Sequence, residues 1–326
     1  MLLRNGWIRS VFDPCSYTLV NHIGTAHLLT IVDDSTILAS SIEMRDFVHR
    51  SIAKSFKITI DLECKHVAGM DVQQNGNKTY TLRQNGATED LFDNHVKDWR
   101  TLPIEDLFDT PMASTSRMAE LTPRQAARAA IPCSAEQITQ VQSQLGSINW
   151  ISITQTDVLF AFKAKAPCAT KANMHDVDEI NRILLYMVRM YRTDNIGLTI
   201  GSSIGVQVYA TVDSSHACTP DMRGHAGGTM HLGPQYGAFS AFSEKIPIAT
   251  DSTAATEGVG GHLITRRVIP IRYYLQELLH SQSKPSRIAM DNVPYMQGAL
   301  GEKGLGKNVK HVLIRLRITD EALEKG

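Results

Sequence analysis

Residues 205–217 read GVQVYATVDSSHA, and the rest of the chain can be interpreted outward from this stretch. The apolar run from Val206 to Val212 predicts a buried strand, and this strand ends on an acid, Asp213. Two further acids follow, Glu257 within STAATEGVG (252–260) and Asp291 within RIAMDNVPYM (287–296). Because a carboxylate at the end of a strand is well placed to hold a metal ion against a phosphate, these three acids form the candidate site.

The composition is that of a soluble globular protein. The chain has 326 residues, 43% of them hydrophobic, and its 33 basic residues balance its 33 acidic ones, so net charge favours no particular partner. The length allows about two or three domains. Five scattered cysteines without a CxxC pair argue against a zinc site and for a reducing, intracellular compartment, with nucleus, cytoplasm and mitochondrion left open. No apolar stretch approaches the ~20 residues of a membrane span.

The front of the chain predicts strands at 16–20, 26–32 and 35–39, then a helix over 42–56. Asp33 and Asp34 lie between the second and third strands. They can present a carboxylate to a metal or form an ordinary Asp-rich turn, and the spacing alone favours the turn. Further strands are expected at 56–60, 67–74 and 78–82, and a helix at 89–99.

The middle of the chain predicts helices. Residues 101–132 contain four prolines and are expected to be a connecting segment on the surface. Helices are predicted at 134–153, 156–165 and 175–192, the first with Ser134 and Gln137 as a capping box. The last helix carries three arginines that can face nucleic acid or solvent, with solvent favoured: Arg182, Arg189 and Arg192.

The rear of the chain predicts a mixed sheet of five strands with helices. The strands are expected at 206–212, 227–233, 235–242, 287–291 and 311–318. A helix over 253–279 carries Glu257 and is expected to break or kink at Pro270, and a short helix is expected after Asn292. The whole chain is therefore predicted to be α/β, with an α+β front part.

Several segments, in this order, resemble those of a known family. They include FDPCSYTL (12–19), LLTIVDDSTILAS (28–40), FKITIDLECKHVAGMDV (56–72), DTPM (109–112), TVDSSHACTPDMRGHAGGTMHLG (211–233), MDNVPYMQGA (290–299) and NVKHVLIR (308–315). Together they resemble the C-terminal part of a copia-type LTR-retrotransposon polyprotein. The resemblance implies a partial reverse-transcriptase palm at 1–112, a helical connection or thumb-like region at 113–205, and an RNase H-like domain at 206–326.

The resemblance also implies roles for the acids. Asp213, Glu257 and Asp291 match the RNase H carboxylates, which would hold Mg²⁺ or Mn²⁺ for phosphodiester hydrolysis. Asp33 and Asp34 match the acids of the polymerase hairpin, as a vestigial polymerase-like metal site. The strand that carries the other polymerase acid lies upstream of the family segment matched here, so we expect no independent reverse transcription.

Two departures from the family pattern concern catalysis. Leu313 stands where the family has its fourth acid, and glycines follow Glu257 at 258, 260 and 261 where the family has bulky residues. Glycine costs up to ~1 kcal/mol in a helix interior, so both departures suggest relaxed pressure on catalysis.

Three functional hypotheses stay open. The first is an RNase H-type enzyme that cuts the RNA strand of RNA–DNA hybrids. The second is a domesticated, catalytically inactive RNA-binding or structural subunit, whose partners would be RNA and the proteins of a large ribonucleoprotein assembly. The third is a fragment of a degraded element. Resemblance of fold does not decide among them.

Overall fold

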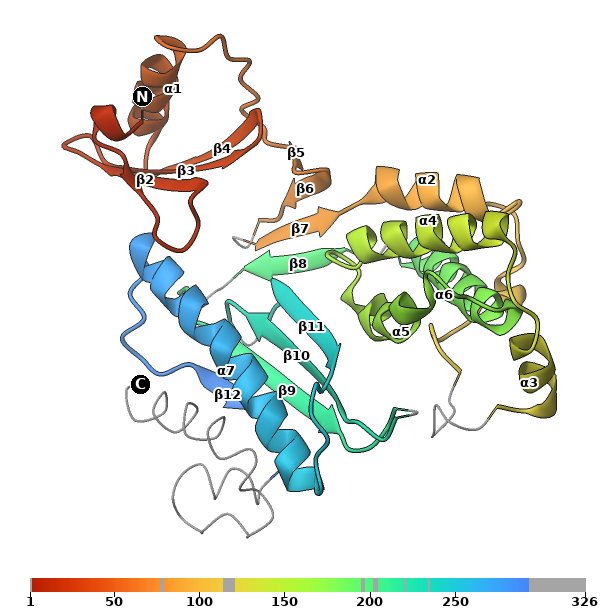
Figure 1. Cartoon of the computed structure of the whole chain (residues 1–326). Helices are drawn as coiled ribbons and strands as arrows, with labels where there is room; N and C mark the ends of the chain where they lie inside the picture. The colour runs from red at the N-terminus through yellow and green to blue at the C-terminus, as the bar shows by residue number, and fades with distance from the viewer. Residues whose placement is uncertain are drawn as a thin grey trace.

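The computed structural model describes residues 2–76, 79–113, 121–194, 197–201, 205–219, 221–233 and 235–292. This part of the chain contains three four-stranded sheets and a layer of helices (Figure 1). Helices and sheets alternate along the sequence, which confirms the predicted α/β class.

The first 53 residues form an N-terminal unit. Its antiparallel sheet follows the order of the sequence: β1 (Ile8–Arg9), β2 (Ser16–Val20), β3 (Thr25–Ile31) and β4 (Asp34–Ala39). Helix α1 (Ile42–Ala53) begins at Ser41, whose side chain accepts a hydrogen bond from the Met44 backbone N–H. Apolar side chains of the sheet and the helix form a small core: Trp7, Leu19, Ala26, Leu28, Met44 and Val48. The three predicted strands and the helix are confirmed.

A second sheet contains β5 (His66–Val67), β6 (Met70–Gln74), β7 (Thr79–Arg83) and β8 (Leu198–Gly201). The strand predicted at 67–74 is a hairpin, because Ala68 and Gly69 both adopt positive φ in a two-residue turn. The strand predicted at 56–60 is wrong: none of the described residues pairs with this segment, and Phe56 and Ile60 lie exposed. Since β8 pairs with β7, the segments 1–112 and 113–205 share this sheet, and the domain boundaries stay a prediction.

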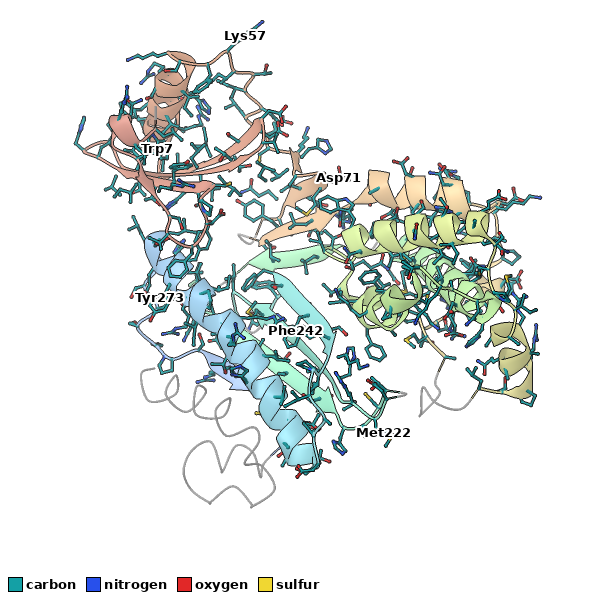
Figure 2. The ribbon with its side chains drawn as sticks, in the orientation of Figure 1. Trp7, Lys57, Asp71, Met222, Phe242 and Tyr273 are labelled. Atoms are coloured by element: carbon teal, nitrogen blue, oxygen red, sulfur yellow. The ribbon has the colours of Figure 1, made fainter. Side chains whose placement is uncertain are left out.

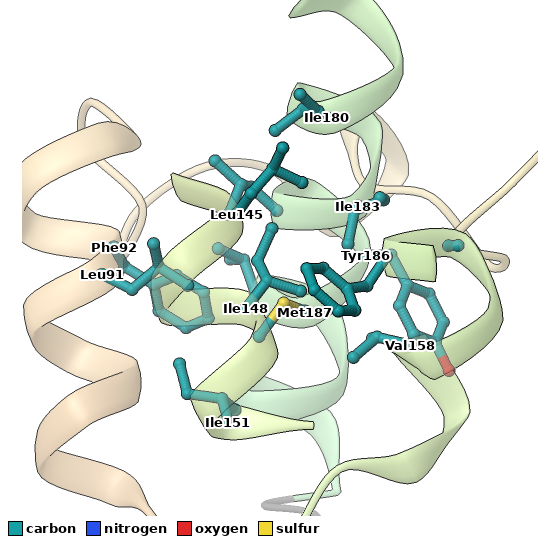
Figure 3. Packing of buried hydrophobic residues seen from close by; sticks show 14 of the residues in the cluster. Leu91, Phe92, Leu145, Ile148, Ile151, Val158, Ile180, Ile183, Tyr186 and Met187 are labelled. Carbon is teal, nitrogen blue, oxygen red and sulfur yellow. The ribbon is translucent and has the colours of Figure 1, made fainter. Parts of the chain in front are cut away.

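The helical layer packs around one apolar core. It contains α2 (Asn85–His95), α3 (Pro123–Ala129), α4 (Ala135–Ile151), α5 (Leu159–Lys165) and α6 (Met174–Thr193). Figure 3 shows Phe92, Leu145, Ile148 and Met187 meeting between these helices. The capping box of Ser134 and Gln137 is confirmed, with both of its hydrogen bonds formed.

Helix α3 lies within a segment predicted to be irregular. Thr122 and Gln125 form a second capping box, and Pro123 occupies the first helical position, where its missing N–H costs nothing. The expectation that 101–132 is a plain surface connection is therefore wrong for this part.

The three arginines of α6 are half-buried against a neighbouring part of the chain. Their guanidinium groups donate hydrogen bonds to the segment that runs alongside α6. Arg182, Arg189 and Arg192 contact the backbone carbonyls of Thr110, Ile104 and Leu102, respectively. Arg182 also lies over the Phe108 ring, and Arg189 forms an ion pair with Asp109. These contacts arise because a segment without a sheet partner satisfies its carbonyls on this helix. The solvated face is therefore only partly present, and the nucleic-acid role stays a prediction.

The third sheet has the order β11-β10-β9-β12. Its strands are β9 (Tyr209–Ser215), β10 (His225–His231), β11 (Ser240–Lys245) and β12 (Arg287–Ala289). The first three are antiparallel neighbours, whereas β12 is parallel to β9, so the predicted mixed sheet is present in these four strands. The strand predicted at 235–242 starts later, at Ser240. The strand predicted at 311–318 and the short helix after Asn292 lie outside the described residues.

Helix α7 (Thr253–Glu277) covers one face of the third sheet. It continues through Pro270, and Val268 and Leu275 on either side of the proline are both buried. The predicted break at Pro270 is therefore wrong: one lost backbone hydrogen bond does not outweigh the packing of the helix on the sheet. In the part of the chain that the structure describes, no helix has both the length and the apolar character needed to cross a membrane.

The C-terminal end of α7 contacts the N-terminal unit (Figure 1). The Glu277 carboxylate accepts hydrogen bonds from Ser10 Oγ at 2.5 Å and from the Val11 backbone N–H at 3.1 Å. The rings of Phe12 and Tyr273 stack with their centroids 5.6 Å apart. Figure 2 shows Trp7 within the N-terminal unit and Tyr273 on the helix below it. One helix therefore joins two parts of the molecule.

Candidate metal centre

Asp213 projects from the exposed face of strand β9. Side chains alternate along the strand, and Ala210, Val212 and Ser214 are buried on the side of α7, whereas Asp213 is exposed. The Asp213 carboxylate accepts a hydrogen bond of 2.8 Å from the Ser214 backbone N–H. The strand predicted from the sequence thus delivers its acid as expected, although it runs three residues further, to Ser215.

Glu257 lies in the second turn of α7 and is only 3% exposed. The helix approaches β9 closely at Gly260, where an added Cβ atom would lie 2.2 Å from Ser214 Oγ. Gly260 lies three residues after Glu257, on the same side of the helix, so this close approach brings Glu257 toward the strand. Relaxed pressure on catalysis is therefore not needed to explain Gly260, because its lack of a side chain sets the helix–strand spacing.

A small hydrogen-bonded cluster ties the end of β9 to the start of α7. His216 Nδ1 and Thr250 Oγ1 each lie 2.7 Å from Thr256 Oγ1. Thr256 Oγ1 also donates to the Ser252 carbonyl, within the first turn of the helix. His216 could not be distinguished from the other histidines of this region by sequence, since its contacts involve residues 34 and 40 positions away.

Asp291 reaches the same place by way of β12. Strands β12 and β9 are parallel, and Ala289 of β12 pairs with Thr211 of β9. Asp291 and Asp213 each lie two residues further along, so both acids lie at the same end of the sheet. One carboxylate oxygen from each of Asp213, Glu257 and Asp291 lies within 4.8 Å of the others. The structure therefore brings together all three acids that the sequence singled out, and we call this group the acid triad.

The surroundings of Glu257 raise its pKa from the ordinary value of 4.5 to about 7. Burial is the largest cause, repulsion from the Asp213 and Asp291 carboxylates adds to it, and the Ser214 backbone N–H partly opposes it. Glu257 Oε2 is buried without a hydrogen-bond partner among the described residues. A bound cation would remove both penalties, so the residues present fit a metal, and hard carboxylate oxygens suit divalent ions of the Mg²⁺ type.

Asp33 and Asp34 lie at the turn between β3 and β4, far along the chain from the acid triad. Val32 adopts a positive φ of 56°, Asp34 pairs with Ile31, and both acids are exposed. Among the residues that the structure describes, the acid triad is the only group of three potential metal ligands, and it does not include this pair. Asp33 and Asp34 therefore fit an ordinary Asp-rich turn. Their role as a polymerase-like metal site stays a prediction.

A groove opens beside Asp213 on the exposed face of the third sheet. It has a volume of about 640 Å³ and is lined by β9, β10 and β11 on one side and by residues such as Asp157 and Phe160 on the other. His225 reaches across the groove, with its ring edge-on to Phe160 at 5.0 Å and its Nε2 2.7 Å from Ser243 Oγ. Burial lowers the pKa of His225. The sequence did not indicate this groove, because its two walls come from separate segments.

In comparisons with known proteins, no protein-family model, no curated protein and no solved structure matched this chain. The acid triad and its surroundings are therefore interpreted from their own geometry.

Proposed function

We propose that the protein is an RNase H-like nuclease that hydrolyses the RNA strand of RNA–DNA hybrids with Mg²⁺ or Mn²⁺. The observation that carries this proposal is the convergence of Asp213, Glu257 and Asp291 within 4.8 Å. They come from a strand, a helix and the end of a second strand, so only the folded chain brings them together. The substrate class, RNA–DNA hybrids, is taken from the resemblance to copia-type polyproteins.

In this proposal each carboxylate has a distinct task. Asp213 and Asp291 are exposed and would hold the cation where the phosphodiester can reach it, whereas Glu257 would hold the cation from the buried side. A divalent cation bound there would polarise the scissile phosphate and lower the pKa of an attacking water. Close packing of α7 at Gly260 and the His216–Thr256 contact fix the position of Glu257.

The alternative is a catalytically inactive RNA-binding or structural subunit of a ribonucleoprotein assembly. Leu313, which lies outside the described residues, stands where the related pattern has a fourth acid, and leucine offers no metal ligand. Independent reverse transcription is not part of either proposal, since Asp33 and Asp34 are joined by no third ligand in the described part of the chain.

The deciding experiment measures cleavage of a labelled RNA–DNA hybrid with Mg²⁺ or Mn²⁺. The nuclease proposal expects metal-dependent cutting that Asp213→Asn reduces by at least about 10²-fold. The matched control is Asp33→Asn with Asp34→Asn, which alters two exposed acids at a distant turn and should leave the rate unchanged. No cutting by a folded protein that still binds RNA would overturn the nuclease proposal and favour the subunit.

A further inference from the structure

We propose that a groove lined by aromatic side chains beside the acid triad binds an unpaired stretch of the RNA strand by base stacking. This inference rests on the proposed function, because it assigns the path by which one strand approaches the acids. We call this feature the stacking groove and define it by Trp150, Phe160, Lys163, His225, Phe239 and Phe242.

The stacking groove is continuous with the acid triad. Its larger part, of about 1080 Å³, lies between α4–α5 and β11, and its smaller part, of about 640 Å³, contains Asp213. The two parts share lining residues, among them Leu159, His225 and Phe242, so a chain lying in one part extends into the other. Figure 2 shows Phe242 on the third sheet, where it belongs to the edge strand β11.

Two of its aromatic side chains are open to solvent. Trp150 and Phe160 are each 44% exposed, although both belong to the helical layer, whose other large apolar side chains are mostly buried. Aromatic faces left open beside a continuous groove are suited to stacking with nucleobases, which is worth roughly 1–3 kcal/mol per base.

The charges of the stacking groove are compatible with a phosphate backbone. The acids of its larger part, Asp221 and Glu244, are ion-paired, with Lys245 at 2.6 Å and with Arg267 at 2.5 Å, respectively. The smaller part contains Asp157, which accepts a hydrogen bond from the Tyr186 hydroxyl, and Asp213 of the acid triad. Lys163 lies over the Phe162 ring at 5.2 Å and forms no ion pair with any described residue. Arg267 also lies over the Phe242 ring at 4.1 Å. The groove thus combines aromatic faces with cations, the pairing that sequence-tolerant single-strand binding uses.

The occupant is an unpaired strand rather than a duplex. Bases within a helix are already stacked on one another, and only splayed bases can lie against aromatic side chains. A single strand that leaves a hybrid at the acid triad would meet Phe160 first, in the smaller part, and Trp150 further on. The groove would therefore favour hybrids that carry a single-stranded RNA extension.

Tryptophan fluorescence tests this inference directly. Trp7 and Trp99 are 3% and 5% exposed, so Trp150 is the tryptophan that a ligand in the groove can quench. We expect a single-stranded oligouridine, titrated with chelator present to prevent cutting, to quench the emission. A blunt RNA–DNA duplex of the same length should quench it much less. Trp150→Phe should abolish the quenching while keeping a ring in the groove and most of the affinity.

Affinity measured by anisotropy of a labelled oligouridine completes the test. Trp150→Ala and Phe160→Ala should each weaken binding by about 5- to 100-fold, and Phe160→Tyr should restore it. Phe56→Ala removes an exposed aromatic ring just after α1 and should leave the affinity unchanged. Unchanged affinity in folded Trp150→Ala and Phe160→Ala variants would overturn the inference.

The outcomes separate this inference from the proposed function. The parent protein should bind oligouridine equally well with chelator and with Mg²⁺, because stacking needs no metal. If the protein cleaves the hybrid but does not bind oligouridine, the nuclease proposal stands and the stacking role of the groove is wrong. Binding that depends on Trp150 without any cleavage would support the groove and favour the RNA-binding alternative.

Discussion

At the scale of single residues, Glu257 has the clearest energetic consequence. Its pKa is about 7 in the folded protein and near 4.5 when unfolded, so the folded state holds the proton more tightly between these values. Without metal, stability should therefore fall as pH rises from about 4.5 to 7 and then level off. The total loss is at most about 3–4 kcal/mol, from ~1.4 kcal/mol per pKa unit.

Glu257→Gln removes this penalty, since glutamine does not ionise. In the presence of a chelator, the variant should be more stable than the parent at pH 8 and nearly equal to it at pH 4, as measured by urea unfolding. Adding Mg²⁺ or Mn²⁺ at pH 8 should stabilise the parent and not the variant. An equal pH profile for both proteins would show that Glu257 ionises freely, against the burial described above.

The three acids of the triad were identified from the sequence, and their immediate surroundings were not. Order along the chain and the strand that ends on Asp213 were sufficient to select them. The burial of Glu257, the contact of Gly260 with Ser214 and the bond from His216 to Thr256 depend on how a helix packs on a strand. Periodicity within one segment carries no information on such distances.

At the scale of elements, the packing of α7 on β9 makes a prediction about Gly260. Alanine is the better helix former by up to ~1 kcal/mol, yet its Cβ would overlap Ser214 Oγ. Gly260→Ala should therefore push the helix away, lower the melting temperature and weaken Mn²⁺ binding.

Ser214→Ala supplies the matched control for Gly260. The Ser214 hydroxyl is buried and has no hydrogen-bond partner among the described residues, so its loss should cost little. The double variant should recover most of the stability and the Mn²⁺ affinity, because Ser214 Cβ lies 3.5 Å from the new methyl position. Additive losses in calorimetry would exclude a direct contact between the two positions.

The arginines of α6 make a second prediction at this scale. Arg192 donates to the Leu102 carbonyl at 2.5 Å, and without it the segment near residue 102 loses a charged hydrogen bond worth about 1.5–3 kcal/mol when fully buried. Arg192→Ala should speed proteolysis around this segment and leave RNA affinity unchanged. Arg50→Ala, on the exposed surface of α1, serves as the control. A large loss of RNA affinity in Arg192→Ala would instead show that Arg192 contributes to RNA binding.

Elements with strong local signals were predicted well. The helix at 135–151 had a capping box and an apolar periodicity, and both are determined by neighbours in the sequence. The strand expected at 56–60 failed because its alternation had no partner strand, and a strand needs a distant neighbour to exist. The pairing of β7 with β8, more than a hundred residues later, was equally beyond local reasoning.

At the scale of the whole molecule, the contact between α7 and the N-terminal unit makes the last prediction. Glu277→Ala removes the acceptor for Ser10 Oγ and the Val11 N–H. Amide hydrogen exchange of residues 8–20 should rise, while Mn²⁺ binding at the acid triad, about 30 Å along the helix, stays unchanged. Gln276→Ala, an exposed neighbour, is the control. Unchanged exchange in Glu277→Ala would mean that the remaining contacts, such as the Phe12–Tyr273 stack and the Tyr274–Ser16 hydrogen bond, hold the unit in place.

The same contact has a consequence for biosynthesis. Ser10 and Glu277 are 267 residues apart, so the N-terminal unit leaves the ribosome long before the helix that receives it. Ser16 and Thr18 are buried in the finished protein, where they contact Tyr274 and Glu277. At a synthesis rate of about 5–20 residues per second, roughly 10–60 seconds pass before these two partners are made. Until then, this face of the nascent sheet is available to chaperones and to other chains.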